Sequence, residues 1–166
     1  MKFKSTLQKF NSNLWGYYIE VPDKAVKKFS DGNQRRVICT LNNALKFQCA
    51  IMPSKKGSAF INVNKKNRDA LNLKIGSEVN VLLEQDKSKY GLPMPEELQE
   101  VLNQDKEGDD IFHALTPGKQ RSVIYMVNNV KNVDKRIRKA IIIIDHLKSM
   151  NGKIDYKILI EELKSS

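Results

Sequence analysis

Clusters of lysine and arginine are the residues of this sequence whose types and spacing imply a binding chemistry. Closely spaced cations can contact successive phosphate groups and release the counterions around them. The sequence therefore predicts a site for a polyanion, either nucleic acid or a phosphate-bearing ligand, although the same charges would suit a plain solvated face. The candidate residues are Lys131, Lys135, Arg136, Arg138 and Lys139 in the second half of the chain, and Arg35, Arg36, Lys65, Lys66 and Arg68 in the first, with Lys55 and Lys56 as a further pair.

Three aromatic residues near the start of the chain could add to such a site. Trp15, Tyr17 and Tyr18 would supply surfaces for base stacking if they were exposed. On an alternating strand, however, Trp15 and Tyr17 would equally suit the core.

The positive charge of the chain is unevenly distributed. The net charge is +10, and residues 1–90 hold 17 Lys or Arg against 7 Asp or Glu, whereas residues 91–166 hold 12 of each kind. The whole excess thus belongs to the first half. A basic unit of this kind attracts anionic partners.

Residues that would assemble into a catalytic centre are not evident. The sequence contains no nucleotide-binding glycine loop, no zinc-protease motif and no nucleophile elbow. The two histidines, His113 and His146, are isolated, which favours structural roles. The adjacent carboxylates Glu96–Glu97 and Asp109–Asp110 diverge on a helix, so they suit a helix N-terminus better than an acid–base pair. We therefore do not expect an enzyme or a bound cofactor.

The cysteines give no sign of a metal site. Cys39 and Cys49 form no CxxC pair and have no histidine near them, so we expect buried free thiols. The longest apolar run, Ala140–Ile144, is far too short to span a membrane. The N-terminal sequence MKFKSTLQKF does not resemble a signal peptide, and we expect a cytoplasmic location.

Residues 1–90 have the pattern of a small β-barrel. Short alternating segments are separated by turn residues every 8–12 positions, with two short helical segments at Pro22–Phe29 and Lys65–Leu71. Asp31–Asn33 and Asn42–Ala44 are the predicted turns around the third strand. The predicted strands are Lys2–Phe10, Leu14–Val21, Arg35–Leu41, Leu45–Met52, Ala59–Val63 and Val79–Glu84.

Helical periodicity replaces this pattern after Gln85–Pro95, which is the predicted linker between domains at residues 1–88 and 92–166. Pro95 is the expected first residue of a helix, a second short helix is expected over Asp109–Leu115, and Thr116 and Pro117 are expected to open a third. Asp155 is the expected cap of the last helix. The predicted inward residues are Leu98, Val101 and Leu102, then Val123, Met126, Val127 and Val130, then Ile137, Ala140, Ile141, Ile144 and Leu147, and finally Tyr156, Leu159, Ile160 and Leu163.

Several segments together resemble a known family. The order of Trp15–Pro22, Leu92–Leu98, Phe112–Lys119 and Arg136–Lys139 is similar to that of the bacteriocin-protection, YdeI/OmpD-associated family. The resemblance implies a double-split β-barrel of unknown function followed by an all-helical OmpD-associated module. It also implies a link to resistance against antimicrobial peptides, with no assigned reaction. Where the family pattern has Thr-Arg before the Arg-Ile pair, this chain has Asn132 and Val133.

A second resemblance concerns the end of the first half. Leu71–Val81, with its Leu-x-Leu, glycine turn and alternating valines, is similar to the end of AbrB/MazE-like split barrels. Two functions follow as hypotheses. The first is a non-enzymatic binding protein of the family named above, and the alternative is an AbrB-like nucleic-acid-binding regulator that uses the basic clusters. An enzyme acting on a small ligand between the domains is the third possibility, with no residues to support it.

Overall fold

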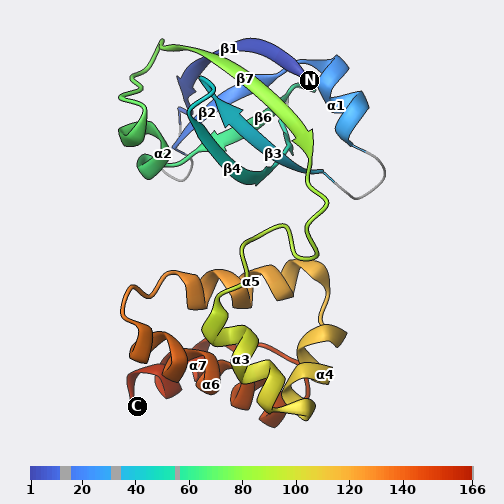
Figure 1. The fold of residues 1–166 in the computed structure, drawn as a ribbon, viewed down its shortest axis with the longest axis vertical. Helices are drawn as coiled ribbons and strands as arrows, with labels where there is room; N and C mark the ends of the chain where they lie inside the picture. Colours follow the sequence, from blue (N-terminus) through green and yellow to red (C-terminus); the bar gives the residue numbers. More distant parts are fainter. Residues whose placement is uncertain (12–15, 31–34, 55–56, 166) are drawn as a thin grey trace. The chain divides into compact units, whose positions relative to one another are not determined.

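The computed structural model describes residues 1–11, 16–30, 35–54 and 57–165 of the chain. These residues form two compact units, Met1–Gly91 and Leu92–Ser166 (Figure 1). The first is a curled antiparallel sheet with two short helices, and the second is entirely helical, which makes the protein α+β. Trp15, the predicted turn at Asp31–Asn33 and the pair Lys55–Lys56 lie outside the described residues.

The first unit is built from a single sheet, in which all strand pairings between described residues are antiparallel. Its strands follow the order β4-β3-β7-β1-β2-β6-β5, so β1 at the start of the chain lies next to β7 at the end of the unit. The described residues form one strand more than the sequence predicts, because the segment after Ile51 pairs with β6 as a separate short strand. The strands are β1 (Lys2–Lys9), β2 (Tyr17–Val21), β3 (Arg36–Leu41), β4 (Leu45–Ala50), β5 (Met52–Pro53), β6 (Ala59–Val63) and β7 (Glu78–Gln85), and the helices are α1 (Asp23–Phe29) and α2 (Lys65–Ala70).

Alternation along the strands decides which face of this sheet becomes the core. Leu7, Ile19 and Ile61 are fully buried on neighbouring strands, and Ile19 stands opposite both of the others in the strand register. The curled sheet encloses this apolar face as a half-barrel. The predicted hairpin at Asn42–Ala44 is confirmed, with Leu41 paired to Leu45. The more specific AbrB-like double-split arrangement stays a prediction.

The second unit consists of five helices among its described residues, and most begin at a side-chain cap. Asp105, Thr116, Asn132 and Asp155 each accept a hydrogen bond from a backbone N–H of the first turn, as helix-capping side chains do. The predicted caps at Thr116, with Pro117 following, and at Asp155 are therefore confirmed. The helices are α3 (Glu96–Gln104), α4 (Lys106–Ala114), α5 (Pro117–Asn128), α6 (Val133–Ser149) and α7 (Tyr156–Lys164).

Two helix starts differ from the prediction. Pro95 is the N-cap of α3 rather than its first helical residue, because its extended backbone places Glu96 first. Helix α4 begins at Lys106, three residues before the predicted start, because the Asp105 carboxylate caps it through the Gly108 N–H.

The central helix α6 buries a different sector from the one predicted. Ala140, Ile143, Ile144 and Leu147 are buried. Ile143 lies beside the predicted stripe, where it and Ile142 are expected to widen the apolar face of the helix. The prediction that Ile137 and Ile141 point inward is wrong, because these side chains are 39% and 44% exposed. The same correction applies in α7, where Tyr156 and Ile160 are exposed while Leu159 is buried.

No helix in the part of the chain that the structure describes is long and apolar enough to cross a bilayer. The cytoplasmic location stays a prediction.

Candidate functional site

An apolar groove runs between α3 and α6 in the helical unit. Its volume is about 600 Å³. The floor is formed by Val101 of α3 together with Val133, Ile137, Ile141 and Ile144 of α6. Three of these, Val133, Ile137 and Ile141, are spaced four residues apart and are large exposed hydrophobic residues. The groove therefore contains the isoleucines that the sequence assigned to the core.

Carboxylates line both sides of this groove. Glu96, Glu97 and Glu100 come from α3, Asp105 follows the end of α3, and Asp145 comes from α6. The groove lining contains no lysine or arginine among the described residues. The groove therefore combines an apolar floor with an acidic rim.

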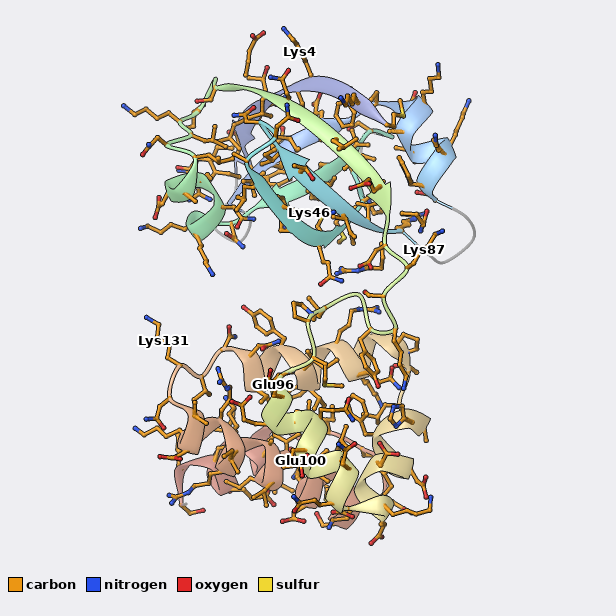
Figure 2. The ribbon with its side chains drawn as sticks, viewed as in Figure 1. Lys4, Lys46, Lys87, Glu96, Glu100 and Lys131 are labelled. Atoms are coloured by element: carbon orange, nitrogen blue, oxygen red, sulfur yellow. The ribbon has the colours of Figure 1, made fainter. Side chains whose placement is uncertain are left out.

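Two of the five carboxylates have no cationic partner within the described chain. Glu96 forms no ion pair there, and Glu100 accepts a hydrogen bond only from the Gln104 amide. Both lie on successive turns of α3 and are labelled in Figure 2. These carboxylates are free to meet a cation from a ligand.

The other three carboxylates, Glu97, Asp105 and Asp145, form ion pairs with cations of α6. Arg136 of α6 donates to Glu97 at 2.5 Å, and this hydrogen bond lowers the pKa of the Glu97 carboxyl. Lys148 contacts Asp105 at 2.5 Å and Asp145 at 2.9 Å. These contacts lower the pKa of Asp105 and raise that of Lys148, so the ions stay charged near neutral pH. Two cations thus link α3 to α6 at opposite ends of the groove.

The predicted cations of the helical unit divide into two groups. Arg136 is half-buried and bound to Glu97, as described above. Lys131, Lys135, Arg138 and Lys139 form no ion pair with any described residue. The last three surround a small hollow of about 310 Å³, whose apolar lining is Val130, Ile142 and Leu163. Three predicted residues thus lie together, on a side of α6 away from the α3 groove.

Arg36 and Arg68 of the sheet unit both contact residues of their own unit. Arg36 donates to the backbone carbonyl of Gly91. Arg68 donates to the Val63 carbonyl at 2.7 Å, and its guanidinium lies 3.7 Å from the centre of the Tyr17 ring. Both contacts stabilise local structure.

The three remaining basic candidates of this unit are exposed. Lys65 forms an exposed ion pair with Asp69 at 3.0 Å, while Arg35 and Lys66 are exposed. No contact of these three residues marks a binding site.

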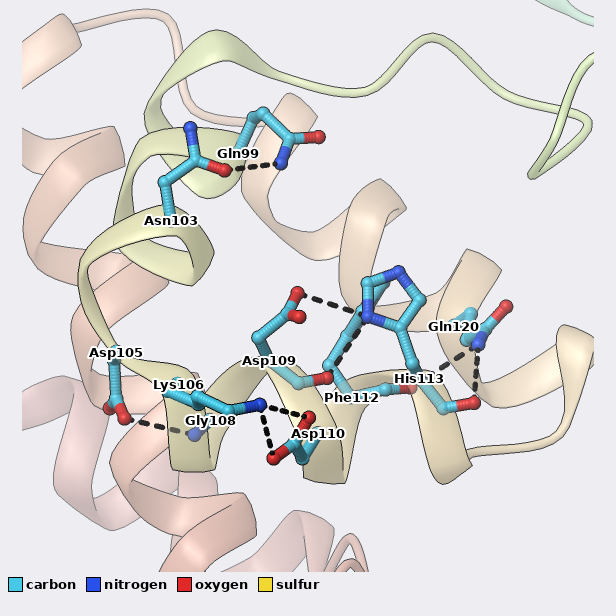
Figure 3. Close-up of polar contacts among 10 residues, drawn as sticks. All are labelled: Gln99, Asn103, Asp105, Lys106, Gly108, Asp109, Asp110, Phe112, His113 and Gln120. Atoms are coloured by element: carbon cyan, nitrogen blue, oxygen red, sulfur yellow. Dashed lines mark hydrogen bonds and ion pairs between the residues drawn. The ribbon is translucent and has the colours of Figure 1, made fainter.

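His113 joins two helices through polar contacts (Figure 3). Its Nδ1 lies 3.0 Å from the Asp109 carboxylate, one helical turn earlier in α4. The Gln120 amide of α5 donates to the backbone carbonyls of Phe112 and His113, at 3.3 and 3.2 Å. The contacts of Gln120 therefore fix the end of α4 to the first turn of α5.

His146 is completely buried and has a fixed tautomer. Its Nε2 accepts the backbone N–H of Asp155 at 3.1 Å, so that nitrogen carries no proton. Nδ1 therefore donates to the Glu162 carboxylate at 2.8 Å. The ring ties α6 to both the cap and the body of α7.

The cysteines lie on the hairpin of β3 and β4. Cys39 is buried and Cys49 is half-buried, and both are free thiols. The hydrogen bond to Cys49 and burial raise the pKa of the Cys39 thiol. Among the described residues, no three His, Cys, Asp or Glu side chains gather as metal ligands would.

Two family models match the chain. The model of a domain of unknown function (DUF1905) matches residues 3–83. That of bacteriocin-protection, YdeI or OmpD-associated proteins matches residues 92–149. No curated protein and no solved structure matches.

Proposed function

Because the chain belongs to the bacteriocin-protection, YdeI or OmpD-associated family and has its two-module layout, we propose that it is a non-enzymatic binding protein. Its proposed ligand is a cationic amphipathic peptide helix, and its proposed binding site is the groove between α3 and α6. The observation that carries the proposal is an apolar floor bordered by carboxylates on both sides.

Shape and polarity both support a helical ligand. An amphipathic helix binds an apolar groove through anchors spaced three or four residues apart. Val133, Ile137 and Ile141 offer such a spacing on the protein side, and Val101 faces them from α3. These side chains are exposed in the isolated chain, so covering them removes apolar surface from water.

The charges support a cationic ligand. Five carboxylates border the groove, and Arg136 and Lys148 neutralise only part of that charge. Antimicrobial peptides that form helices have one apolar face and a second face rich in lysine and arginine. Such a peptide could lay its apolar face on the isoleucines while its cations meet Glu96 and Glu100.

Fluorescence anisotropy with a labelled, designed helical peptide tests the proposal. The peptide carries leucine on one face and lysine on the other, and its partner peptide has glutamate in place of every lysine. We expect the lysine peptide to bind and the glutamate peptide to bind at least about tenfold more weakly, because opposite charges attract and like charges repel at the rim.

Variants of the protein identify the groove. Glu96→Gln with Glu100→Gln should weaken the lysine peptide about 3- to 10-fold, the effect of losing two solvent-exposed ion pairs. Ile141→Ser should weaken it about tenfold by removing an apolar anchor. The matched control is Ile160→Ser, which removes an equally exposed isoleucine from α7. Equal binding of the two peptides, or an Ile160→Ser effect as large as that of Ile141→Ser, would contradict the proposal.

A second candidate function is binding of a polyanion by the helical unit. Lys131, Lys135, Arg138 and Lys139 support it, because none forms an ion pair within the described chain. If four phosphates are neutralised, the logarithm of the affinity for duplex DNA should fall with log salt at a slope of about −3.6. Replacing the last three residues by serine should flatten that slope, and no binding at low salt would exclude this function.

Two structural expectations accompany these functions. We propose that residues 1–88 and 92–166 are separate domains, and that the first is a double-split barrel of the AbrB type. Separate expression of the two segments tests the first point, since each should give a cooperative unfolding transition. An experimental structure of residues 1–88 tests the second.

A further inference from the structure

We infer that the outer face of the sheet formed by β1, β2, β6 and β5 carries a second binding site, which takes the ring of a nucleobase. This site lies in the first unit and does not depend on the peptide groove.

Strand alternation places an unexpected group of side chains on this outer face. Leu7, Ile19 and Ile61 face the core, so their neighbours Tyr18 and Phe60 face the other way. None of Phe10, Tyr18 and Phe60 belongs to the buried core cluster of the unit. Phe60 is nevertheless buried, at 8% exposed, whereas Phe10 and Tyr18 are half-buried and keep part of their surface open to a ligand.

The three rings form one continuous surface. Phe10 stacks on Tyr18 with ring centres 4.0 Å apart. Phe60 makes edge-to-face contacts with both, with ring centres 5.0 Å from Phe10 and 5.8 Å from Tyr18. They line a hollow of about 790 Å³, together with Met52 of β5. Concave sites for small ligands commonly have volumes of about 300–1,000 Å³ and aromatic walls. The hollow is thus large enough for a bicyclic ring.

Polar groups around the hollow indicate a ring with hydrogen-bonding edges. The Tyr18 hydroxyl donates to Gln8 Oε1 at 2.8 Å, and no described residue accepts a bond from the Gln8 Nε2 amide. Glu20, two residues after Tyr18, adds an acceptor, and Ser58 adds a hydroxyl. Donors and acceptors beside stacked rings suit a heterocycle with N–H and carbonyl edges better than a hydrocarbon ring.

Charge narrows the ligand class further. At the hollow itself, Lys9 and Glu20 offset one another, which suits a neutral ring. The unit as a whole is strongly basic, with 17 cationic against 7 acidic side chains in residues 1–90. A neutral ring attached to phosphate, which is the chemistry of a nucleotide in a single strand, fits both observations.

Nuclear magnetic resonance of the full-length protein, with labelled phenylalanine and tyrosine rings, tests the inference. The probes are the four common nucleosides, with indole as an aromatic control that lacks a carbonyl edge. They are added to about 10 mM, which detects millimolar dissociation constants. We expect at least one nucleoside to shift the ring signals of Phe10, Tyr18 and Phe60 in a saturable way, and indole to shift them less.

Two variants make the result specific. Tyr18→Leu should weaken nucleoside binding about 5- to 150-fold, as removal of one stacking ring does. Glu20→Gln, an exposed change that leaves the rings in place, should alter which base binds best. The control is Tyr125→Leu, which removes an exposed tyrosine from α5 and should change nothing.

Three outcomes would overturn the inference. The first is the absence of ring shifts with every nucleoside, and the second is indole binding as tight as that of the best nucleoside. The third is a single-stranded oligonucleotide that binds without moving these ring signals, which would assign binding to phosphate contacts elsewhere. Because the peptide assay reports on the other unit, failure here leaves the proposed function unaffected.

Discussion

Gly108 of α4 packs against Ile144 of α6, and its replacement by alanine tests that packing. A Cβ atom at this position would stand 2.3 Å from Ile144 Cγ2, and 3.0 Å from the Asp105 carboxylate that caps α4. Carbon atoms in contact are normally about 3.5–4.0 Å apart. Alanine therefore forces the two helices apart or moves the Ile144 side chain.

Two opposing effects set the expected magnitude. Alanine in place of a helical glycine stabilises a helix by about 1 kcal/mol. Overpacking of a close contact costs about 1–3 kcal/mol, and a displacement of more than 1 Å favours the upper part of that range. We expect Gly108→Ala to lower the free energy of unfolding by about 1–2 kcal/mol.

Urea unfolding followed by circular dichroism at the helical band measures this change, since the helices of the second unit dominate that signal. The control is Gly118→Ala in α5, where no atom lies within 4 Å of the added Cβ. That variant should be neutral or stabilised by up to about 1 kcal/mol.

A second background reveals whether the contact with Ile144 is the cause. Ile144→Leu removes the Cγ2 methyl while nearly conserving volume, at a cost of less than about 1.5 kcal/mol. In that background Gly108→Ala should have no effect on the free energy of unfolding or should raise it. The coupling energy between the two substitutions would then be about 1–2 kcal/mol. An equal loss in both backgrounds would refute the reasoning, because the clash would then not involve the Ile144 methyl.

Further variants test individual contacts. Glu97→Gln should lower the free energy of unfolding by about 1 kcal/mol near neutral pH. Because Arg136 lowers the folded-state pKa of Glu97, the ion pair stabilises the protein above the ordinary carboxyl pKa of 4.5, and this stabilisation is lost as the pH falls through the folded-state pKa. Urea unfolding should therefore show the stabilities of the variant and the wild type converging in acid. His146→Ala should lower the free energy of unfolding by about 2–4 kcal/mol, measured in the same way, since it leaves a cavity and removes the acceptor of the partly buried Asp155 N–H. In Cys49→Ala, Cys39 should react with a thiol reagent only after denaturant is added, as mass spectrometry would show, because the Cys39 side chain is fully buried and burial disfavours the reactive thiolate.

Local patterns in the sequence predicted most elements of this fold. The caps at Thr116 and Asp155 depend on residues within one helical turn, and the Asn42–Ala44 hairpin depends on turn residues between two alternating segments. β6 was predicted with its observed bounds, Ala59–Val63, because its apolar residues lie between clear turn signals. Each of these elements can be predicted because the residues that specify it lie within a few positions of one another in the chain.

The groove between α3 and α6 could not be found in this way. Periodicity showed that α6 is apolar over a wide sector, but not which part of that sector a neighbouring helix would cover. The partner helices covered Ile143 and left Ile137 and Ile141 exposed. Similarly, Arg136 looked like one more member of a basic cluster, and its partner Glu97 lies 39 residues earlier in the sequence. An uninterrupted isoleucine run beside a charged segment was the one available signal that α6 has more apolar surface than one core needs.

The hydrogen bonds of His146 have a consequence for local motion in the helical unit. Of the described residues of α7, only Leu159 is fully buried, so this helix has little apolar area to hold it. The His146 imidazole therefore holds α7 in place, and opening of α7 requires the hydrogen bond from the Asp155 N–H to His146 Nε2 to break. Amide hydrogen exchange should then report Asp155, although it precedes the helix, as one of the slower amides at this end of the chain, exchanging in step with the first turns of α7.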